Sequence, residues 1–155
     1  MAPDIKAAIA AISFQYALPS NLVRAICQVE SNFEPYAFRY EPQYKWLVGD
    51  KLTMTVTEKF GQMCSWGLMQ VMGGVAREYH FTGPLPALCE PAIGLNYGCR
   101  HLKKFFEQHG NWEDAVASYN AGSPRKVAGV FLNQDYVKKV MAAWSHWDTT
   151  TQKEA

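Results

Sequence analysis

The segment LPSNLVRAICQVES, residues 18–31, constrains the fold of this chain more than any other. Pro19 and Ser20 predict a helix start, with the Ser20 hydroxyl as acceptor for the first free backbone N–H groups. Apolar residues then recur at helical spacing: Leu22, Val23, Ile26, Val29 and Phe33. Such a stripe must face a core, so we predict an amphipathic helix over residues 20–31.

Glu30 follows Val29 at the end of this stripe, where a core would meet a cleft. A carboxyl group that is partly sheltered by apolar neighbours keeps its proton to a higher pH, which is what a general acid requires. A lone glutamate at the end of an amphipathic helix is more often an ordinary surface residue. The interpretation of Glu30 as a catalytic group therefore depends on the rest of the chain.

The remaining pattern predicts one mainly α domain over residues 1–148, with a polar tail over 149–155. Proline at first helical positions, an asparagine cap and terminal glycines mark the helix boundaries. Helices are expected at 4–17, 20–31, 65–72 with a continuation to 79 after a Gly-Gly break, 91–108, 112–121 and 135–147, with a loop at 82–91. The length is also that of a single domain.

Residues 34–63 interrupt the helical pattern with prolines and many aromatic residues. Over residues 52–57, β-branched side chains predict a short strand or hairpin. The sequence Thr55-x-x-Glu58 is equally a capping box that opens a short helix. We therefore expect a small irregular or β wing after the Glu30 helix.

Composition narrows the function class. With 15 Lys and Arg against 14 Asp and Glu, the formal net charge is +1, which gives no overall basic field for nucleic acid. No apolar run reaches the length of a membrane span, and the first 20 residues lack the pattern of a signal peptide.

The four cysteines and four histidines show no metal-ligand spacing, so we expect no metal or other cofactor. Reduced thiols are the default without an export signal, although a Cys89–Cys99 bridge stays open as an alternative.

Three segments occur in a particular order: AICQVESNFEPYA (25–37), SWGLMQVM (65–72) and DAVASYNAGSPRKV (114–127). Together they resemble the conserved segments of the lytic transglycosylases of the soluble-transglycosylase type, which share the lysozyme-like fold with goose-type lysozyme. DYVKKV (135–140) is similar to the Tyr-Val segment that follows in this family, and NYGCRHL (96–102) fits its long central helix. The match covers residues 16–145.

The resemblance implies a mainly α, lysozyme-like α+β domain that cleaves the glycan strands of peptidoglycan without a cofactor. Glu30 would be the sole acid/base, protonating the glycosidic oxygen between N-acetylmuramic acid and N-acetylglucosamine. It would then take the proton of the muramic acid 6-hydroxyl, which closes onto C1 to give a 1,6-anhydro end. An intramolecular nucleophile needs no second carboxylate, whereas hydrolysis in the usual scheme needs a pair. In the family, the matching residues line the cleft or contact the sugar or the acid: Ser65, Met69, Gln70, Tyr119, Asn120 and Tyr136.

The chain departs from the family pattern in the interval from Glu30 to Ser65, which is longer here and contains the acids Glu41, Asp50 and Glu58. Glu41 is the best candidate for a second carboxylate, which would make the protein a hydrolytic muramidase of the same fold. A second alternative is a wall-binding structural component with an inactive cleft.

The small size, the missing export signal and the aromatic insertion together resemble bacteriophage members of the family. These act as lysis enzymes, or travel in the virion and open the wall at infection. We therefore expect a monomer that is made in the cytoplasm and acts on the periplasmic cell wall.

Overall fold

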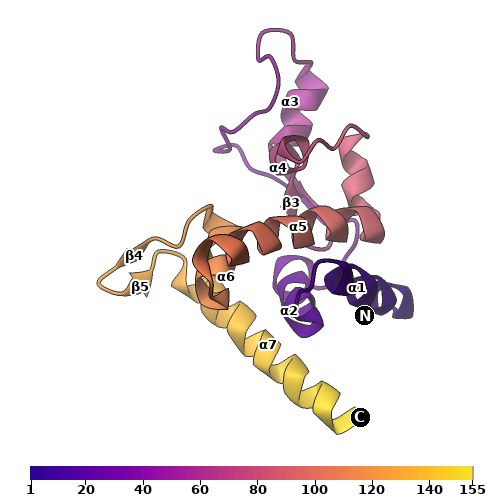
Figure 1. Ribbon diagram of the computed structural model, residues 1–155. Helices are drawn as coiled ribbons and strands as arrows, with labels where there is room; N and C mark the ends of the chain where they lie inside the picture. The colour runs from indigo at the N-terminus through magenta and orange to yellow at the C-terminus, as the bar shows by residue number, and fades with distance from the viewer. Residues whose placement is uncertain (155) are drawn as a thin grey trace.

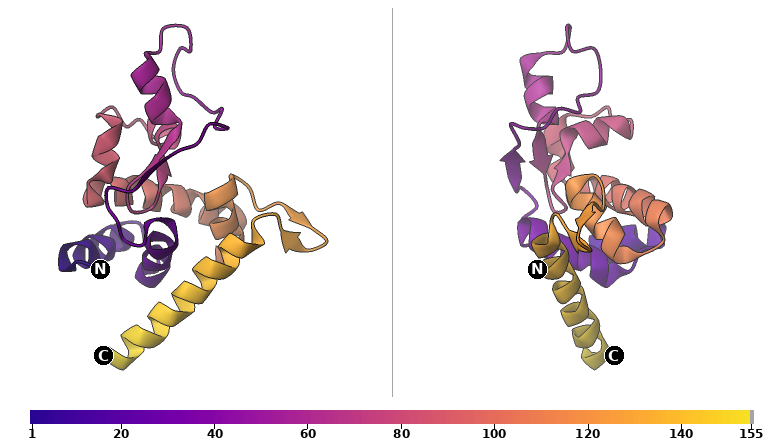
Figure 2. Two further views of the ribbon diagram at one scale, coloured as in Figure 1. Left: turned by 180° about the vertical axis from the view of Figure 1, so that it is seen from behind. Right: turned by 90° about the vertical axis from the view of Figure 1, so that its left-hand side faces the viewer.

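The structure, a computed structural model that describes residues 1–154, has a mainly α, lysozyme-like fold with a small β wing (Figures 1 and 2). The longer helices are α1 (Pro3–Gln15), α2 (Ser20–Ser31), α5 (Pro91–His109), α6 (Trp112–Ala121) and α7 (Gln134–Glu154). Helix α5 crosses the middle of the molecule in Figure 1, with α1 and α2 on one side and the wing on the other. No helix within residues 1–154 is long and apolar enough to cross a membrane.

Helix α2 lies in the centre of the core, as its apolar stripe predicts. The fully buried residues of its inner face are Leu22, Val23, Ala25, Ile26 and Cys27. This face packs against α7 and α1, while α5 packs against α6 and α1. Burying five such side chains fixes the direction of α2 and therefore the position of its last turn, which carries Glu30.

The predicted boundaries of the central helices are confirmed. Pro91 begins α5, and Gly110 ends it with a φ of 70°. The Asn111 side chain caps α6 by accepting from the Asp114 N–H at 2.9 Å, and Gly122 ends that helix with a φ of 74°. Glycine is favoured at both ends because a left-handed backbone there costs it no steric strain.

The predicted capping role of Ser20 is wrong. Pro19 is the residue before the first turn of α2, and its carbonyl accepts from the Leu22 and Val23 N–H groups. Ser20 is therefore already inside the helix, and no side chain caps this end. The fixed φ of proline starts the helix in place of a cap.

The predicted helix over 65–72 is also wrong, because this segment forms a tight hairpin. Strand β2 (Cys64–Trp66) pairs antiparallel with β3 (Val71–Met72), and α4 (Gly73–Glu78) begins where a break was expected. Gly67 has a φ of 71° and Gln70 a φ of 48°, which are turn conformations. A side chain at Gly67 would also collide with the Leu88 carbonyl. Contacts with distant parts of the chain thus override the local apolar run.

The wing consists of a three-stranded sheet and two short helices. Strand β1 (Phe38–Tyr40) pairs antiparallel with β2, with Phe38 opposite Trp66. Helix α3 (Val56–Gln62) is capped by Thr55, the residue before it, whose hydroxyl accepts from the Glu58 N–H at 3.2 Å. Of the two alternatives at 52–57, the capping box is therefore confirmed and the strand is wrong.

Three further segments differ from expectation. The predicted loop at 82–91 contains a 3₁₀ helix, η1 (Leu85–Cys89). Strands β4 (Lys126–Val127) and β5 (Val130–Phe131) form a hairpin between α6 and α7. Helix α7 continues through Glu154 into the expected tail, and Asn21 of α2 holds it by donating to Asp148 at 2.9 Å. Residue 155 lies outside the described part of the chain.

The four cysteines, at positions 27, 64, 89 and 99, are free and buried, so Cys89 and Cys99 are not bridged. Burial raises the pKa of the Cys99 thiol to about 12, which keeps it protonated and unreactive. Within residues 1–154, no cluster of His, Cys, Asp and Glu side chains has the arrangement of a metal site.

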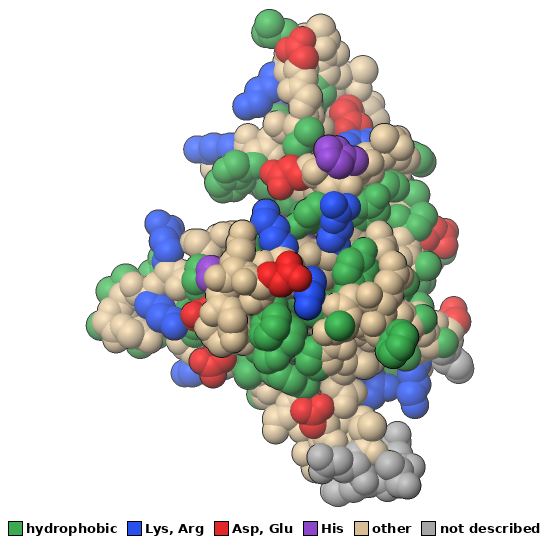
Figure 3. All heavy atoms as spheres, in the orientation of Figure 1, with side chains coloured by type: hydrophobic (Ala, Val, Ile, Leu, Met, Phe, Trp, Pro, Cys, Tyr) green, Lys and Arg blue, Asp and Glu red, His purple; other side chains and the backbone are tan. Residues whose placement is uncertain are grey.

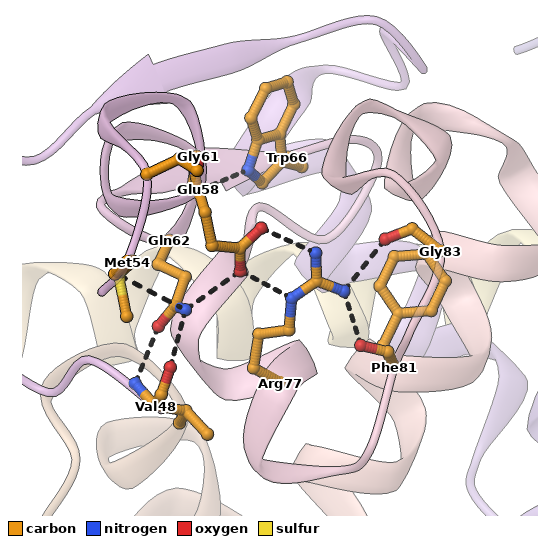
Figure 4. Close-up of polar contacts among 10 residues, drawn as sticks. Val48, Met54, Glu58, Gly61, Gln62, Trp66, Arg77, Phe81 and Gly83 are labelled. Atoms are coloured by element: carbon orange, nitrogen blue, oxygen red, sulfur yellow. Dashed lines mark hydrogen bonds and ion pairs between the residues drawn. The ribbon is translucent and has the colours of Figure 1, made fainter. Parts of the chain in front are cut away.

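An ion pair between Arg77 of α4 and Glu58 of α3 stabilises the wing (Figure 4). Arg77 donates to Glu58 Oε1 at 2.7 Å and to Oε2 at 2.9 Å, and also to the carbonyls of Phe81 and Gly83. Gln62 donates to Glu58 Oε1 at 2.9 Å. The bonds from Arg77 lower the pKa of the Glu58 carboxyl. The bidentate geometry makes this a strong pair for its partly exposed position.

We expect Arg77→Met to lower the free energy of unfolding by about 2 kcal/mol, because it leaves Glu58 and two carbonyls without their donor. Urea unfolding at neutral pH measures this change. Lys59→Met is the matched control, since Lys59 is exposed on the same helix as Glu58. Equal stability of the two variants would show that the ion pair contributes nothing to the wing.

Candidate active site

Glu30 lies in the last turn of α2 and faces Tyr136 in the first turn of α7. The Tyr136 hydroxyl donates to Glu30 Oε1 at 2.7 Å. Burial raises the pKa of the Glu30 carboxyl, while the bond from Tyr136 and the charge of Arg39 act in the opposite direction. A carboxyl group with a raised pKa holds its proton to a higher pH than a free glutamate, so it can act as a general acid toward a bound substrate.

Contacts along α2 and α7 hold Tyr136 and Glu30 in register. The Trp147 indole donates to Gln28 Oε1 at 2.8 Å, and its ring meets Phe33 edge-on with 6.3 Å between ring centroids. Two left-handed residues, Asn32 and Phe33, turn the chain sharply after α2 toward the wing. The site therefore lies between α2, α7 and the wing.

Tyr119 in α6 is a second tyrosine whose pKa responds to the charge of Glu30. Its hydroxyl donates to the Met69 carbonyl at 2.7 Å. Burial raises the pKa of Tyr119 well above its ordinary value, and the charge of Glu30 raises it further. Tyr119 is therefore a neutral donor that ties α6 to the wing hairpin beside Glu30.

His101 of α5 supports Tyr119 from behind. The two rings meet edge-on with centroids 5.6 Å apart, and His101 Nδ1 hydrogen-bonds the Tyr79 hydroxyl at 2.9 Å. Burial, together with the charge of Lys104, lowers the pKa of His101 to about 4. The imidazole is therefore neutral over most of the pH range in which the fold is stable.

We expect this histidine to make stability depend on pH. The unfolded chain binds the His101 proton near the ordinary pKa of 6.5, whereas the folded chain binds it only near 4. Lowering the pH through this window therefore costs stability, by about 3 kcal/mol in all. Urea unfolding at several pH values measures the slope, which should be shallower in His101→Phe. The same slope in both proteins would contradict the assignment.

Ser65, Gln70 and the turn between them form the wing side of the site. Ser65 Oγ donates to Gln70 Oε1 at 2.8 Å, and Gln70 Nε2 donates to the carbonyls of Ala37 and Gly67, each at 3.0 Å. The side chains of Ser65 and Met69 are buried, at 2% and 0% exposure. Both residues therefore shape the wall from behind, whereas Gln70 is partly exposed.

Asn120 is exposed at the end of α6. Its side-chain oxygen accepts from Asn133 Nδ2 at 2.9 Å, and the same amide donates to the Ala117 carbonyl at 3.0 Å. Asn133 thus connects the end of α6 with the start of α7, which carries Tyr136.

Ser31 and Asn133 have no predicted role, although both connect elements of the site. Ser31 Oγ donates to the Leu68 carbonyl at 2.8 Å and so joins the end of α2 to the wing hairpin. Ser31 directly follows Glu30 in the segment 25–37 that resembles the family, and this position could have indicated a role for it. No comparable sequence signal marks Asn133, because its hydrogen bond to Asn120 exists only in the folded chain.

Arg39 of β1 and Glu41, just after it, form an ion pair with each other. Their side chains are 67% and 34% exposed. The charge of Arg39 lowers the pKa of Glu30, and that of Glu41 raises it. The candidate second carboxylate is therefore already bound by a cation.

The transglycosylase SLT domain model matches residues 7–142, which covers most of the chain. The chain therefore belongs to the SLT transglycosylase family, whose members are lytic transglycosylases with peptidoglycan-related activity. It is similar to protein IpgF of Shigella sonnei, with 26% identity over 115 residues. The aligned stretch is 72% of this chain and 64% of that protein, so this chain spans less than two thirds of its relative.

Proposed function

We propose that this protein is a peptidoglycan lytic transglycosylase with Glu30 as its only acid/base. It cleaves the β-1,4 bond between N-acetylmuramic acid and N-acetylglucosamine and leaves 1,6-anhydro-muramic acid ends. The observation that carries the proposal is the partly buried Glu30 carboxyl, which has a raised pKa and accepts a hydrogen bond from the Tyr136 hydroxyl. Membership of the SLT family supports the substrate class.

The reaction needs two proton transfers, one from Glu30 and one back to it, and the two protons are different. Protonated Glu30 donates to the glycosidic oxygen as the bond from that oxygen to C1 breaks, which leaves positive charge on the muramic acid ring. The Glu30 carboxylate, held by Tyr136, then takes the proton of the 6-hydroxyl as that oxygen bonds to C1. Glu30 is protonated again at the end, and no water is consumed.

The intramolecular nucleophile explains why one carboxylate is enough. The 6-hydroxyl belongs to the same sugar as C1, so it needs neither a bound water nor a second base to position it. Tyr119 and the hairpin from Ser65 to Gln70 then act as the walls that hold the sugar against Glu30.

A hydrolytic muramidase is the second candidate, and the position of Glu41 favours it. The charge of Glu41 raises the pKa of Glu30. A general base on the opposite side of the scissile bond would act on the acid in the same way. The ion pair of Glu41 with Arg39 opposes this role, because a carboxylate oxygen that accepts from a guanidinium is not free to take a proton from water.

Glu41→Gln separates the two candidates. We expect the variant to release soluble fragments from purified peptidoglycan at a rate within about twofold of the parent, since an exposed ion pair contributes little. A muramidase that used Glu41 as its base would instead lose about 10²-fold or more. Glu113→Gln, at an exposed acid of α6 outside the insertion, is the matched control, whereas Asp50→Asn tests the other acid that a muramidase could use.

A further inference from the structure

One face of the wing sheet carries aromatic residues that the proposed reaction does not use. Side chains alternate along a strand, so Phe38 and Tyr40 of β1 lie on the face opposite to Arg39. Phe38 stacks on Trp66, with 5.6 Å between ring centroids and 24° between planes. Tyr40 stacks on Phe60, with 4.7 Å and 14°. We call these four residues the aromatic strip.

Three of the four rings of the strip are open to solvent, and that of Trp66 is partly buried. Phe38 is 59% exposed, Phe60 47% and Tyr40 43%. A ring that is covered on one face by its partner and is still this exposed presents its other face to water. In the view of Figure 3, which has the orientation of Figure 1, hydrophobic side chains on the upper lobe are mixed with acidic and basic ones. Contiguous exposed aromatic surface of this kind is uncommon on a monomer and marks a binding surface.

A hollow of about 440 Å³ adjoins the strip. Its apolar lining residues are Val56, Phe60, Trp66, Pro84, Leu85 and Pro86. Its charged members, Glu58 and Arg77, are bound to each other, and Arg77 also donates to two carbonyls (Figure 4). The hollow therefore offers apolar surface, and the two charges in its lining neutralise each other.

We propose that the aromatic strip and its hollow form a second glycan-binding surface, which holds a peptidoglycan strand other than the one being cleaved. This inference rests on the proposed function, because that function supplies the polymer. The C–H faces of pyranose rings pack flat on aromatic faces, and the sugar backbone is uncharged, as is the strip. Residues paired across two strands share a face, so Ser65, which pairs with Arg39, lies on the face opposite to the strip. The proposed function places Ser65 on the cleft side, so a second glycan strand can be bound on the strip while the first lies in the cleft.

A second contact with an insoluble polymer acts through effective concentration. Once one strand is bound on the strip, the next strand is presented to the cleft without a new diffusional encounter. The strip should therefore matter for intact sacculi, which contain many linked strands. It should be unimportant for a short soluble oligosaccharide, which reaches only the cleft.

The test is a double variant, Phe38→Thr with Tyr40→Thr, in which β-branched residues preserve the strand. Binding is measured by co-sedimentation with purified sacculi, with Glu30→Gln added so that the polymer stays intact. We expect the dissociation constant to rise by about tenfold on loss of two aromatic contacts. Phe14→Ala is the matched control, since Phe14 is 89% exposed on α1, and it should bind like the parent.

The same double variant with Glu30 intact is assayed on soluble glycan oligosaccharides. A rate within about twofold of the parent, with weaker sacculus binding, supports the proposal, because it also shows that the fold and the cleft are intact. Unchanged binding, absence of binding by the parent, or parallel loss of binding and soluble-substrate cleavage would each overturn it. If no protein cleaves either substrate but sacculus binding still depends on the strip, the proposed function fails and the binding surface stands.

Discussion

Glu30→Gln should lower the rate at which soluble fragments are released from peptidoglycan by about 10³-fold, because the amide can neither donate nor accept the transferred proton. The fold should survive. Burial already disfavours the Glu30 carboxylate, so replacing it by a neutral group of the same shape should leave the melting temperature equal or slightly higher. Turbidity loss of sacculus suspensions and thermal unfolding measure the two effects.

Glu34→Gln is the matched control for this variant. Glu34 is exposed just beyond the end of α2, where its carboxylate accepts from the Tyr36 N–H at 3.0 Å. The Glu34→Gln protein should keep full activity on peptidoglycan. An active Glu30→Gln protein would remove the central residue of the proposal, and an inactive Glu34→Gln protein would show that the assay responds to the chain segment and not to the acid.

Tyr136→Phe should have the second largest effect on the reaction, with a rate about tenfold lower at acidic pH. The hydroxyl stabilises the Glu30 carboxylate that forms when the proton leaves, so its loss raises the barrier of the first step. The same bond opposes the effect of burial on the pKa of Glu30. Without it that pKa rises further, because the charged form loses its donor.

The pH dependence follows with a definite sign. The first step needs protonated Glu30, so the rate falls as pH rises through its pKa. In Tyr136→Phe this falling limb should move to higher pH. Rates on soluble oligosaccharides over a pH series measure the limb, with Tyr36→Phe, at an exposed tyrosine outside the site, as control. A limb that stays in place, or moves to lower pH, would show that Tyr136 does not act on the charge of Glu30.

The parts of the fold that were predicted correctly depend on local signals. The stripe of α2, the proline at the start of α5, the Asn111 cap and the terminal glycines all act within one or two turns of the chain. The hairpin over 65–72 could not be predicted in this way. Its turn depends on the close approach of Gly67 to the Leu88 carbonyl and on bonds from Gln70 to Ala37, more than 20 positions away. Strand β1 likewise exists only through its pairing with β2.

The candidate site was predicted through a resemblance, and the structure adds the contacts between its parts. Glu30 and Tyr136 are 106 positions apart in sequence and share a hydrogen bond. The sequence does not indicate that Met69 acts through its backbone carbonyl, which accepts from the Tyr119 hydroxyl, while its side chain is buried. This contact depends on how α6 packs against the hairpin. The catalytic and binding roles of these residues stay predictions until variants are measured.

The mass of the soluble muropeptides tests the central claim most directly. Purified peptidoglycan is digested with the parent protein, and the fragments are analysed by mass spectrometry without prior reduction. The proposal predicts muramic acid ends in the 1,6-anhydro form, with none from Glu30→Gln. Fragments with reducing ends, each heavier by one water, would contradict the proposal and would make hydrolysis, with Glu41 as the base, the mechanism to pursue.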